Sequence, residues 1–396
     1  MKMFLKRTFL LAFVAISINI FAQTNDAISK DQLSGGSTNS IQTAVPFLGI
    51  APDSRGGSMG DAGVATSPDV NSQYWNPAKY AFAKSDMAIG FTYTPWLRNL
   101  INDINLSYLA GYYRFTEDQT VSASLRYFSF GNITFTDGTG NTVKNFNPNE
   151  FSFDIGYSRL FGKTISGAIA FRYIRSDLTG GYSNTTESNA GQAFATDIAV
   201  YYQNGVHLAD KTGQMAFGLN ISNIGSKLSY NQDQKKDFLP MNLRLGGRLT
   251  INMDDYNKLT GTIDFNKLLV PTPPIVDSTG AIVKGMDNDV SITKAIFQSF
   301  YDAPGGMSEE IKEVTYSIGA EYAYANQFFF RGGYFHESQM KGNRKYYTFG
   351  AGLKYNILTL DFAYLIPSSG RNNPLSNTVR FSLIFELESS TIRGRR

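Results

Sequence analysis

The stretch that decides the fold is Phe151–Phe161, which reads FSFDIGYSRLF. In an extended chain, Phe151, Phe153, Ile155 and Tyr157 would share one face. The residues between them are polar or small and would share the other face. A two-residue period of this kind predicts a β-strand with one apolar face.

The same alternation recurs along the chain in about 14 segments of roughly ten residues, which is the strand length and even strand number of an outer-membrane barrel. We therefore expect an all-β fold, a 14-stranded antiparallel transmembrane β-barrel over residues 86–388, followed by a periplasmic tail over 389–396. The apolar rows would face lipid. The segments cover 87–93, 104–112, 121–127, 151–157, 165–173, 194–202, 215–221, 241–249, 259–265, 314–324, 328–334, 347–355, 358–364 and 379–385. In the second of these segments, the row assigned to lipid is Ile104, Leu106, Tyr108, Ala110 and Tyr112.

The connections between the segments alternate in length. Short periplasmic turns alternating with long outer loops are typical of such barrels, whereas a soluble sandwich has no reason to sort its loops by length. The short connections are Phe115–Asp118, Gly162–Lys163, Asn252–Tyr256, Ala325–Asn326 and Asn356, with a longer one at Gln203–Gly213. The long connections are Phe130–Glu150, Ser176–Gln192, Asn223–Pro240, Lys267–Lys312, His336–Arg344 and Pro367–Ser376.

The faces opposite the apolar rows carry charged residues. A charge facing lipid at mid-depth would cost roughly 2–4 kcal/mol, so we place these side chains in the lumen. Counting outward from the short turns puts Asp154 opposite Arg172 and Glu321 opposite Arg331, which predicts two lumen ion pairs. We interpret the charges as a network that stiffens the wall, with a transport or catalytic role as the alternative. The set is Arg126, Asp154, Arg172, Asp197, Arg244, Arg248, Asp264, Glu321, Arg331, Asp361 and Arg380.

The amino terminus has the parts of a secretory signal peptide. Met1–Arg7 is basic, Phe9–Ile20 is mostly apolar, and the small residue Ala22 precedes a plausible cleavage point. The apolar run is shorter than the roughly 18–20 residues that a membrane-spanning helix needs. We therefore expect a signal peptide over 1–22 and a flexible segment over 23–45.

Composition excludes several classes of function. The chain has 36 Lys and Arg against 33 Asp and Glu, and removal of a basic signal peptide would leave it near neutrality, without the basic surface that nucleic acid requires. It has no Cys and only two His, so thiol catalysis, disulfides and a His-cluster metal site are not expected. Asp287–Asp289 reads as a solvated loop or helix cap in preference to a calcium site. No catalytic motif occurs, and we expect neither an enzyme nor a cofactor nor a metal.

The segment 46–85 precedes the first predicted strand and is dense in small residues. Residues 46–66 read PFLGIAPDSRGGSMGDAGVAT. Small residues allow close backbone packing but build no core of their own, so we expect this segment to lie inside the barrel as a plug. Its motif residues are Arg55, Gly56, Gly57, Met59, Gly60, Asn76, Pro77 and Ala78.

The connection Lys267–Lys312 is far longer than loops usually run without a reason. We expect Asp289 to cap a helix there. With the apolar stretch Leu268–Pro271, this helix would give the outer side of the barrel an apolar surface. This surface could be a lid folded onto the rim or a docking site for another protein, and the sequence does not decide between the two interpretations. The helix would present Ile292, Ala295, Ile296, Ser299 and Phe300 on one face. The candidate docking residues are Leu268, Val270, Pro271, Ile296, Phe297 and Phe300.

Two sets of residues carry a resemblance to a known family. Arg55–Gly63, together with Asn76–Ala78, resembles the start of the PorV/PorQ group, distant relatives of the fatty-acid channel FadL. Later stretches are more similar to PorV than to PorQ. They are Leu239–Arg244, Asp264–Pro273, Asp302–Gly306, Gly333–Glu337 and Lys341–Gly352.

The resemblance implies an outer-membrane role in the type IX secretion system of Bacteroidota. Members of the PorV family bind the C-terminal signal domain of cargo that leaves the Sov/SprA translocon barrel. They carry it to the attachment complex of the sortase PorU with PorQ and PorZ, and they perform no chemistry. The rival interpretation is a FadL-like pore for hydrophobic small molecules, against which the many charged or small lumen positions count. A surface enzyme is a third option, which no acid–base or nucleophile arrangement supports.

Overall fold

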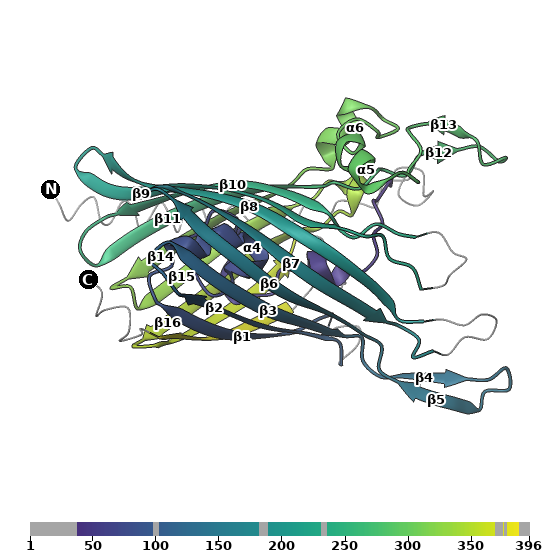
Figure 1. Ribbon diagram of the computed structural model, residues 1–396, viewed down its shortest axis with the longest axis horizontal. Helices are drawn as coiled ribbons and strands as arrows, with labels where there is room; N and C mark the ends of the chain where they lie inside the picture. Colours follow the sequence, from purple (N-terminus) through teal and green to yellow (C-terminus); the bar gives the residue numbers. More distant parts are fainter. Residues whose placement is uncertain are drawn as a thin grey trace. The chain divides into compact units, whose positions relative to one another are not determined.

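Antiparallel strands close into a barrel in the computed structural model, which describes residues 38–97, 103–181, 189–230, 236–368, 375 and 378–387 (Figure 1). Within these residues the barrel has 14 strands, and the first pairs with the last. The expected signal peptide, the start of segment 23–45 and the expected tail lie outside the described residues. The barrel strands are β1 (Met87–Pro95), β2 (Asn105–Arg114), β3 (Gln119–Ser129), β6 (Asn149–Phe161), β7 (Ile165–Asp177), β8 (Gly191–Leu208), β9 (Lys211–Gly225), β10 (Asn242–Asn252), β11 (Asn257–Leu268), β14 (Thr315–Tyr324), β15 (Phe328–His336), β16 (Lys345–Tyr355), β17 (Leu358–Pro367) and β18 (Thr378–Leu387).

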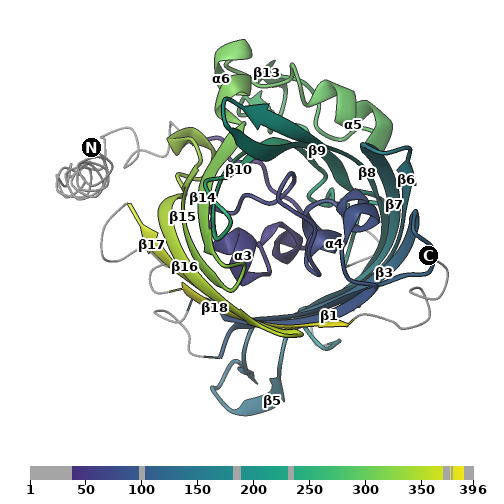
Figure 2. The same ribbon diagram turned by 90° about the vertical axis from the view of Figure 1, so that its left-hand side faces the viewer.

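Short elements lie inside the ring and at the end that carries the long loops. Figure 2 looks along the barrel and has α3 and α4 within the ring of strands. No helix among the described residues is both long and apolar enough to cross a membrane. The inner elements are η1 (Pro46–Gly49), α3 (Ser54–Gly57), α4 (Ser72–Trp75) and η2 (Pro77–Phe82). Those at the loop end are the hairpins β4 (Ile133–Thr136) with β5 (Thr142–Phe146) and β12 (Ile275–Val276) with β13 (Ile282–Lys284), and α5 (Ile292–Gln298), α6 (Met307–Lys312) and η3 (Gln339–Lys341).

The two faces of the wall differ in polarity as the alternation predicts. On β6, Phe153 and Ile155 are exposed on the outer face, while Asp154 between them is buried. All the charged residues that the sequence assigned to the lumen are buried. The exposed apolar face and buried charged face confirm the predicted fold class.

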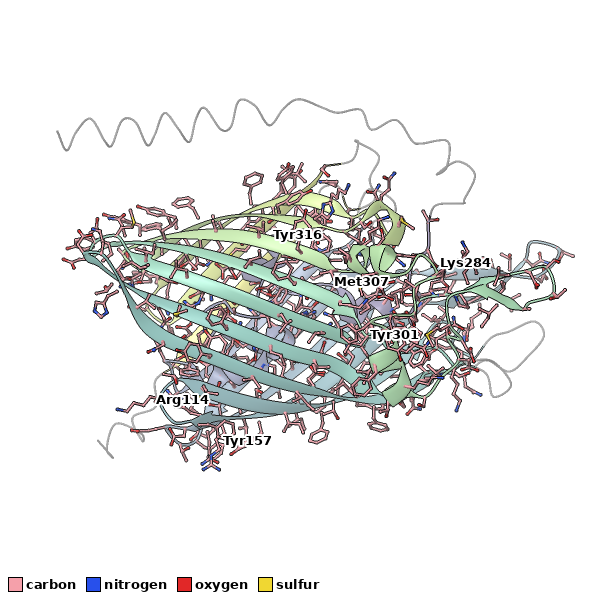
Figure 3. The ribbon with its side chains drawn as sticks, turned by 90° about the horizontal axis from the view of Figure 1, so that it is seen from above. Arg114, Tyr157, Lys284, Tyr301, Met307 and Tyr316 are labelled. Atoms are coloured by element: carbon pink, nitrogen blue, oxygen red, sulfur yellow. The ribbon has the colours of Figure 1, made fainter. Side chains whose placement is uncertain are left out.

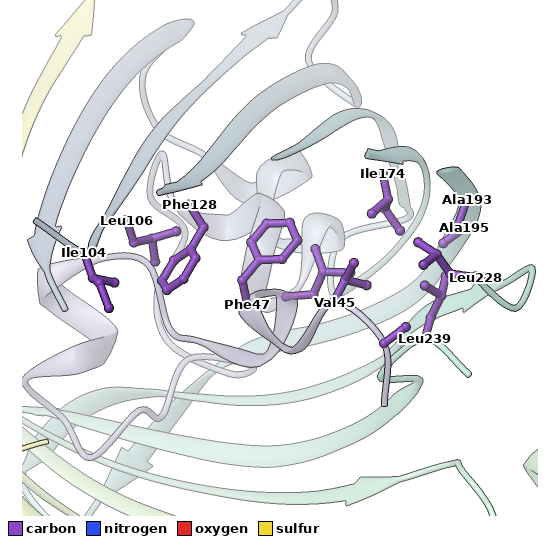
Figure 4. Close-up of a cluster of buried hydrophobic side chains, with 12 residues drawn as sticks. Val45, Phe47, Ile104, Leu106, Phe128, Ile174, Ala193, Ala195, Leu228 and Leu239 are labelled. Atoms are coloured by element: carbon purple, nitrogen blue, oxygen red, sulfur yellow. The ribbon is translucent and has the colours of Figure 1, made fainter. Parts of the chain in front are cut away.

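Strand β2 corrects one prediction. Its row Ile104, Leu106, Tyr108, Ala110 and Tyr112 is buried, and Leu109 and Tyr113 face outward instead. Both faces of this strand carry apolar residues, so alternation alone could not decide which one faces lipid. The inward row packs in clusters with apolar residues of the inner segment, and Figure 4 has Phe128 of β3 between Leu106 and Phe47.

A second correction concerns the segment Gln203–Gly213, which was expected to be a connection. Strands β8 and β9 continue through it, with Leu208 opposite Lys211. Ala209 adopts a left-handed conformation, with φ of 53°, in the two-residue turn between them. All the connections at this end are therefore short, which strengthens the contrast between the two ends.

Candidate functional site

The inner segment, residues 46–82, which we call the plug, touches the wall where three neighbouring strands carry glycine. Gly319, Gly333 and Gly350 lie on β14, β15 and β16. A Cβ atom on either of the first two would collide with Met59, and one on the third with Ser58. Glycine at these three wall positions leaves room for the plug backbone to approach the strands closely.

Two plug glycines make room for large side chains. A Cβ atom on Gly56 would collide with the ring of Trp75, and one on Gly57 would collide with the guanidinium of Arg380 on β18. Asp53 begins the short helix α3 by accepting a bond from the Gly56 amide, at 2.8 Å, and it also accepts one from Trp75 Nε1, at 2.6 Å. The glycines of the sequence motif therefore serve packing within the lumen.

Gly60 and Asn76 attach the plug through their own polar groups. The Gly60 amide donates to Thr348 Oγ1 at 2.8 Å, and the residue adopts φ of 72°. Asn76 caps η2 by accepting from the Ala78 amide at 3.0 Å, and its Nδ2 donates to the Val200 carbonyl of β8 at 3.0 Å. Pro77 begins η2. Proline suits this position because the first residue of a helix makes no hydrogen bond within the helix through its amide.

Arg55 joins the plug to an ion network in the wall. Its guanidinium lies 2.9 Å from Asp69 Oδ2 within the plug and 3.2 Å from Glu321 Oε2. Glu321 also pairs with Arg331 at 2.7 Å, and Arg331 reaches Asp361 at 2.6 Å. Glu321 stands directly opposite Arg331, as the hairpin register predicts. One buried network therefore spans the plug and the strands β14, β15 and β17.

A second network lies on the other side of the lumen. Arg172 pairs with Asp154, which stands directly opposite it as predicted, and with Asp197 at 3.0 Å. Arg172 also donates to the side-chain oxygen of Asn223. Asp197 sits at a β-bulge of β8, where the register with β9 shifts. The alternation along β8 points its carboxylate inward, where it joins Arg172.

Wall side chains also bind the backbone of the plug. Their donors reach plug carbonyl oxygens, and one carboxylate receives plug amides. Because each contact is made to a backbone group, it does not depend on the side chain that the plug carries at that position. The contacts are Arg126 Nη1 to Leu48 O at 2.9 Å, Arg244 Nη1 to Tyr74 O at 2.8 Å, Arg248 Nε to Ala65 O at 3.1 Å, and Asp264 Oδ2 from the amides of Gly63 at 2.6 Å and Val64 at 2.8 Å.

The space above the plug is a vestibule of about 330 Å³ on the side of the long loops. Leu48, Ile50 and Tyr74 of the plug line its floor, and Arg244 and Arg344 line its sides. The guanidinium of Arg244 stacks on the Tyr74 ring at 4.3 Å. The vestibule is therefore a mixed polar and apolar pocket with the plug as its base.

The segment between β11 and β14, residues 269–314, which we call the cap, is held to the rim by a buried ion cluster. Lys267 of β11 lies 2.6 Å from Glu313 and 3.0 Å from Glu310. Lys341 from the loop after β15 lies 2.6 Å from Glu309 and 2.9 Å from Glu313. These contacts bind α6 to strand β11 and to the loop after β15, and sequence periodicity gave no sign of them.

The helix expected in the cap forms, but Asp289 does not cap it. Ser291 does, since its Oγ accepts from the Lys294 amide at 3.4 Å, while Asp289 pairs with Lys227 at 2.9 Å. The helix ends at Gln298, so Phe300 lies beyond it. The second helix and the β12–β13 hairpin were not predicted.

The cap divides the candidate docking residues into two groups. Val270 and Pro271 are buried at its base, and Leu268 and Ile296 are half-buried, so they stabilise the cap and the structure gives them little surface to offer. Large apolar side chains project from the cap with exposures between 43% and 67%, and Figure 3 labels two of them. They are Phe297, Phe300, Tyr301, Met307 and Ile311.

Two carboxyl groups of the cap have shifted pKa values. Burial raises the pKa of Asp302 to about 6, although the Thr272 amide donates to it. Burial opposes ionisation of Glu309 as well, but the hydrogen bonds from Lys341, the Gly305 amide and Asn39, together with the charge of Lys341, outweigh it and lower the pKa of this carboxyl. Among the described residues, no group of three or more His, Cys, Asp or Glu side chains is placed to hold a metal ion.

The fold is similar to that of solved channels and transporters. A deletion mutant of the monoaromatic hydrocarbon channel TodX is 12% identical over 84% of this chain and 97% of its own, with a TM-score of 0.50. The toluene transporter TodX of Pseudomonas putida is 9% identical over 88% and 98%, with a TM-score of 0.44. A FadL homologue of Pseudomonas aeruginosa is 9% identical over 89% and 100%, with a TM-score of 0.42. At these identities the likeness concerns the fold alone.

A family profile matches more of the sequence than any single motif does. The profile described as "Type IX secretion system protein PorV" matches residues 34–275, more than half of the chain, and no curated protein matches significantly. The match includes the whole plug and the strands β1 to β11. A closed 14-stranded barrel with an apolar outer face resides in the outer membrane, with its short turns toward the periplasm. The chain belongs to the PorV family of type IX secretion system proteins.

Proposed function

We propose that this protein is a non-enzymatic cargo carrier of the type IX secretion system. It binds the C-terminal signal domain of cargo at the Sov/SprA-type translocon. It then delivers that domain to the attachment complex of PorU, PorQ and PorZ. The observation that carries the proposal is the row of large apolar side chains that the cap presents on the extracellular side.

A docking role fits the way the cap is built. Large apolar side chains gathered on an exposed surface mark interaction sites. Here Met307 and Ile311 stand on α6, which Lys267 and Lys341 tie to the barrel through buried ion pairs, and Phe297 stands on α5, which packs on the apolar core of the cap. A rigid support lowers the conformational entropy lost on binding. A few apolar anchors then supply most of the affinity.

The wall and the plug weigh against a FadL-like pore. Each strand of the described barrel pairs with a neighbour on both sides, so the described wall has no gap through which a hydrophobic molecule could leave sideways. The plug is held by backbone contacts and by the network through Arg55, so opening the lumen would break several buried bonds. A transporter of small molecules remains the second candidate because the fold resembles that of such channels.

The proposal is tested by capture of partners from native outer membranes in mild detergent. Phe297→Ser and Ile311→Ser remove exposed anchors from α5 and α6, and each should reduce recovery of the translocon barrel and of cargo signal domains by roughly tenfold or more. Ile133→Ser is the matched control, since Ile133 is an exposed apolar residue on the β4–β5 hairpin at the same end of the barrel. Equal recovery by all three variants would refute docking through the cap.

The transporter alternative has its own measurement. Organic extraction of the purified protein followed by mass spectrometry reports any molecule held in the lumen. A stoichiometric hydrophobic compound whose loss follows disruption of the vestibule, for example by Leu48→Asp, would favour transport. Recovery of the translocon or of cargo without such a compound supports the carrier.

A further inference from the structure

The outer wall contains an apolar groove of about 520 Å³ that the secretion role does not use. It crosses the lipid-facing side of β15, β16, β17, β18 and β1. These five strands are neighbours in the ring of Figure 2. Residues that stand directly opposite one another across these strands form a continuous row. From β15 to β1, this row reads Phe330, Ala351, Phe362, Phe381 and Tyr93.

Ala351 creates the hollow. It is the one small side chain in a row that is otherwise aromatic, so the rings of Phe330 and Phe362 stand on either side of a single methyl group. The Phe362 and Phe381 rings lie 5.4 Å apart and continue one wall of the hollow. The next row toward the periplasm is also entirely apolar. It reads Phe328, Leu353, Leu360, Leu383 and Phe91.

The groove lies in the periplasmic half of the barrel. Ala351 is four residues from the periplasmic end of β16, and Phe330 is two residues from that of β15. With a rise of about 3.3 Å per residue and a strand tilt near 40°, four residues correspond to roughly 10 Å of depth. The hydrocarbon that meets this surface therefore belongs to the inner leaflet of the outer membrane.

We propose that the groove is a binding site for one acyl chain of a glycerophospholipid from the periplasmic leaflet. Its occupant is fixed by its position, because the groove belongs to the surface that this barrel buries in the bilayer. Its lining offers almost no polar contact, which suits a methylene chain and leaves a polar ligand unsatisfied. The aromatic side walls hold the chain in place, whereas a flat wall would let it exchange freely.

A matched pair of substitutions tests the site. Ala351→Phe fills the hollow. Ala123→Phe is the control, because Ala123 is also exposed on the lipid face and four residues from the periplasmic end of its strand, but its neighbours across β2 and β6 are Gly111 and Ile155. The full-length protein is purified in mild detergent and incubated with phosphatidylethanolamine or with lipid A. Retained lipid is then counted by native mass spectrometry.

The wild type should retain one phosphatidylethanolamine and the Ala123→Phe variant should do the same. Retention by Ala351→Phe should fall roughly tenfold or more, which corresponds to at least about 1.4 kcal/mol. Equal retention by all three proteins, or preferential retention of lipid A, would overturn the proposal. If Ala351→Phe fails to fold, Phe381→Ala removes a wall of the groove and should lower retention likewise. A phosphatidylethanolamine with a photoreactive acyl chain should label β15 to β17 in the wild type, and uniform labelling around the barrel would also contradict the site.

Discussion

The plug and the cap are both folded segments attached to the same barrel, but they are attached in opposite ways. The wall holds the plug through its backbone at many points, and its large side chains, such as Tyr74 and Trp75, are buried. The cap is held mainly by one ion cluster and a small apolar core beneath it. Five of its large apolar side chains, named above, are exposed.

This difference separates stability from recognition. A segment whose large side chains are buried and whose backbone is bonded to the wall has little surface left to offer a partner. The cap, in contrast, is held by ion pairs at its base and leaves large apolar side chains exposed on its outer surface. Substitutions in the lumen should therefore change the stability of the barrel, and those on the cap surface should change binding alone.

The largest effect is expected from Arg172→Met. The change leaves the carboxylates of Asp154 and Asp197 buried without their guanidinium, which should cost about 3–5 kcal/mol of unfolding free energy. Arg175→Met is the matched control three residues along the same strand, where the ion pair with Asp177 is half-exposed, and it should cost about 1 kcal/mol or less. Thermal unfolding followed by heat-modifiable gel mobility measures both. A similar loss in the two variants would contradict the buried network.

The next largest effect is expected from Lys341→Ala. Glu309 loses its lysine partner and Glu313 loses one of its two, so the cap should open more easily, by roughly 2–3 kcal/mol. The barrel should keep its melting temperature, because the strands retain their ladders. Lys312→Ala, an exposed position on α6, is the control. Proteinase K cleavage within the cap should be faster in the first variant alone, and cleavage that is unchanged would show that the cluster does not hold the cap.

A smaller effect depends on pH. The folded cap raises the pKa of Asp302 from 3.8 to about 6, so the folded state binds this proton more tightly than the unfolded state. The stabilising contribution is complete below about pH 4 and is lost as the pH rises through 6. Asp302→Asn should remove this dependence. Hydrogen exchange of cap amides, corrected for intrinsic rates, measures the effect. Between pH 4 and 6, the protection of these amides should fall in the wild type compared with the Asp302→Asn variant.

The smallest effect on stability is expected at the cap surface. Phe297→Ser and Met307→Ser alter exposed side chains away from the ion cluster, so the unfolding free energy should change by no more than about 0.5 kcal/mol. Partner capture should nevertheless fall. A large loss of stability in either variant would mean that these side chains support the cap, and the separation of the two regions would fail.

Much of the barrel could be predicted because lipid and lumen impose opposite demands on alternate residues. The alternation located the strands, and the short turns gave the register that joins Asp154 to Arg172. It failed for β2, where both faces carry apolar residues and packing against the plug distinguishes the inward one. The plug itself was located by its small residues, but the wall glycines such as Gly333 that receive it were not recognised.

The cap could not be predicted in the same way. Its attachment joins three distant stretches of the sequence and follows no period. The residues are Lys267, Glu309, Glu310, Glu313 and Lys341. The apolar groove was equally hidden, because its row takes one residue from each of five strands. Both features depend on how the strands are staggered around the barrel, which alternation within a single strand does not determine.

The most direct test of the proposed role is export in cells that carry a cap with four serines, at Phe297, Phe300, Met307 and Ile311. The barrel should insert at normal levels, and type IX cargo should accumulate inside the cell in place of reaching the surface. Cells with serines at Ile133 and Val143 on the β4–β5 hairpin should export normally. Normal surface display of cargo by the four-serine protein would contradict the proposal that the cap is the docking surface.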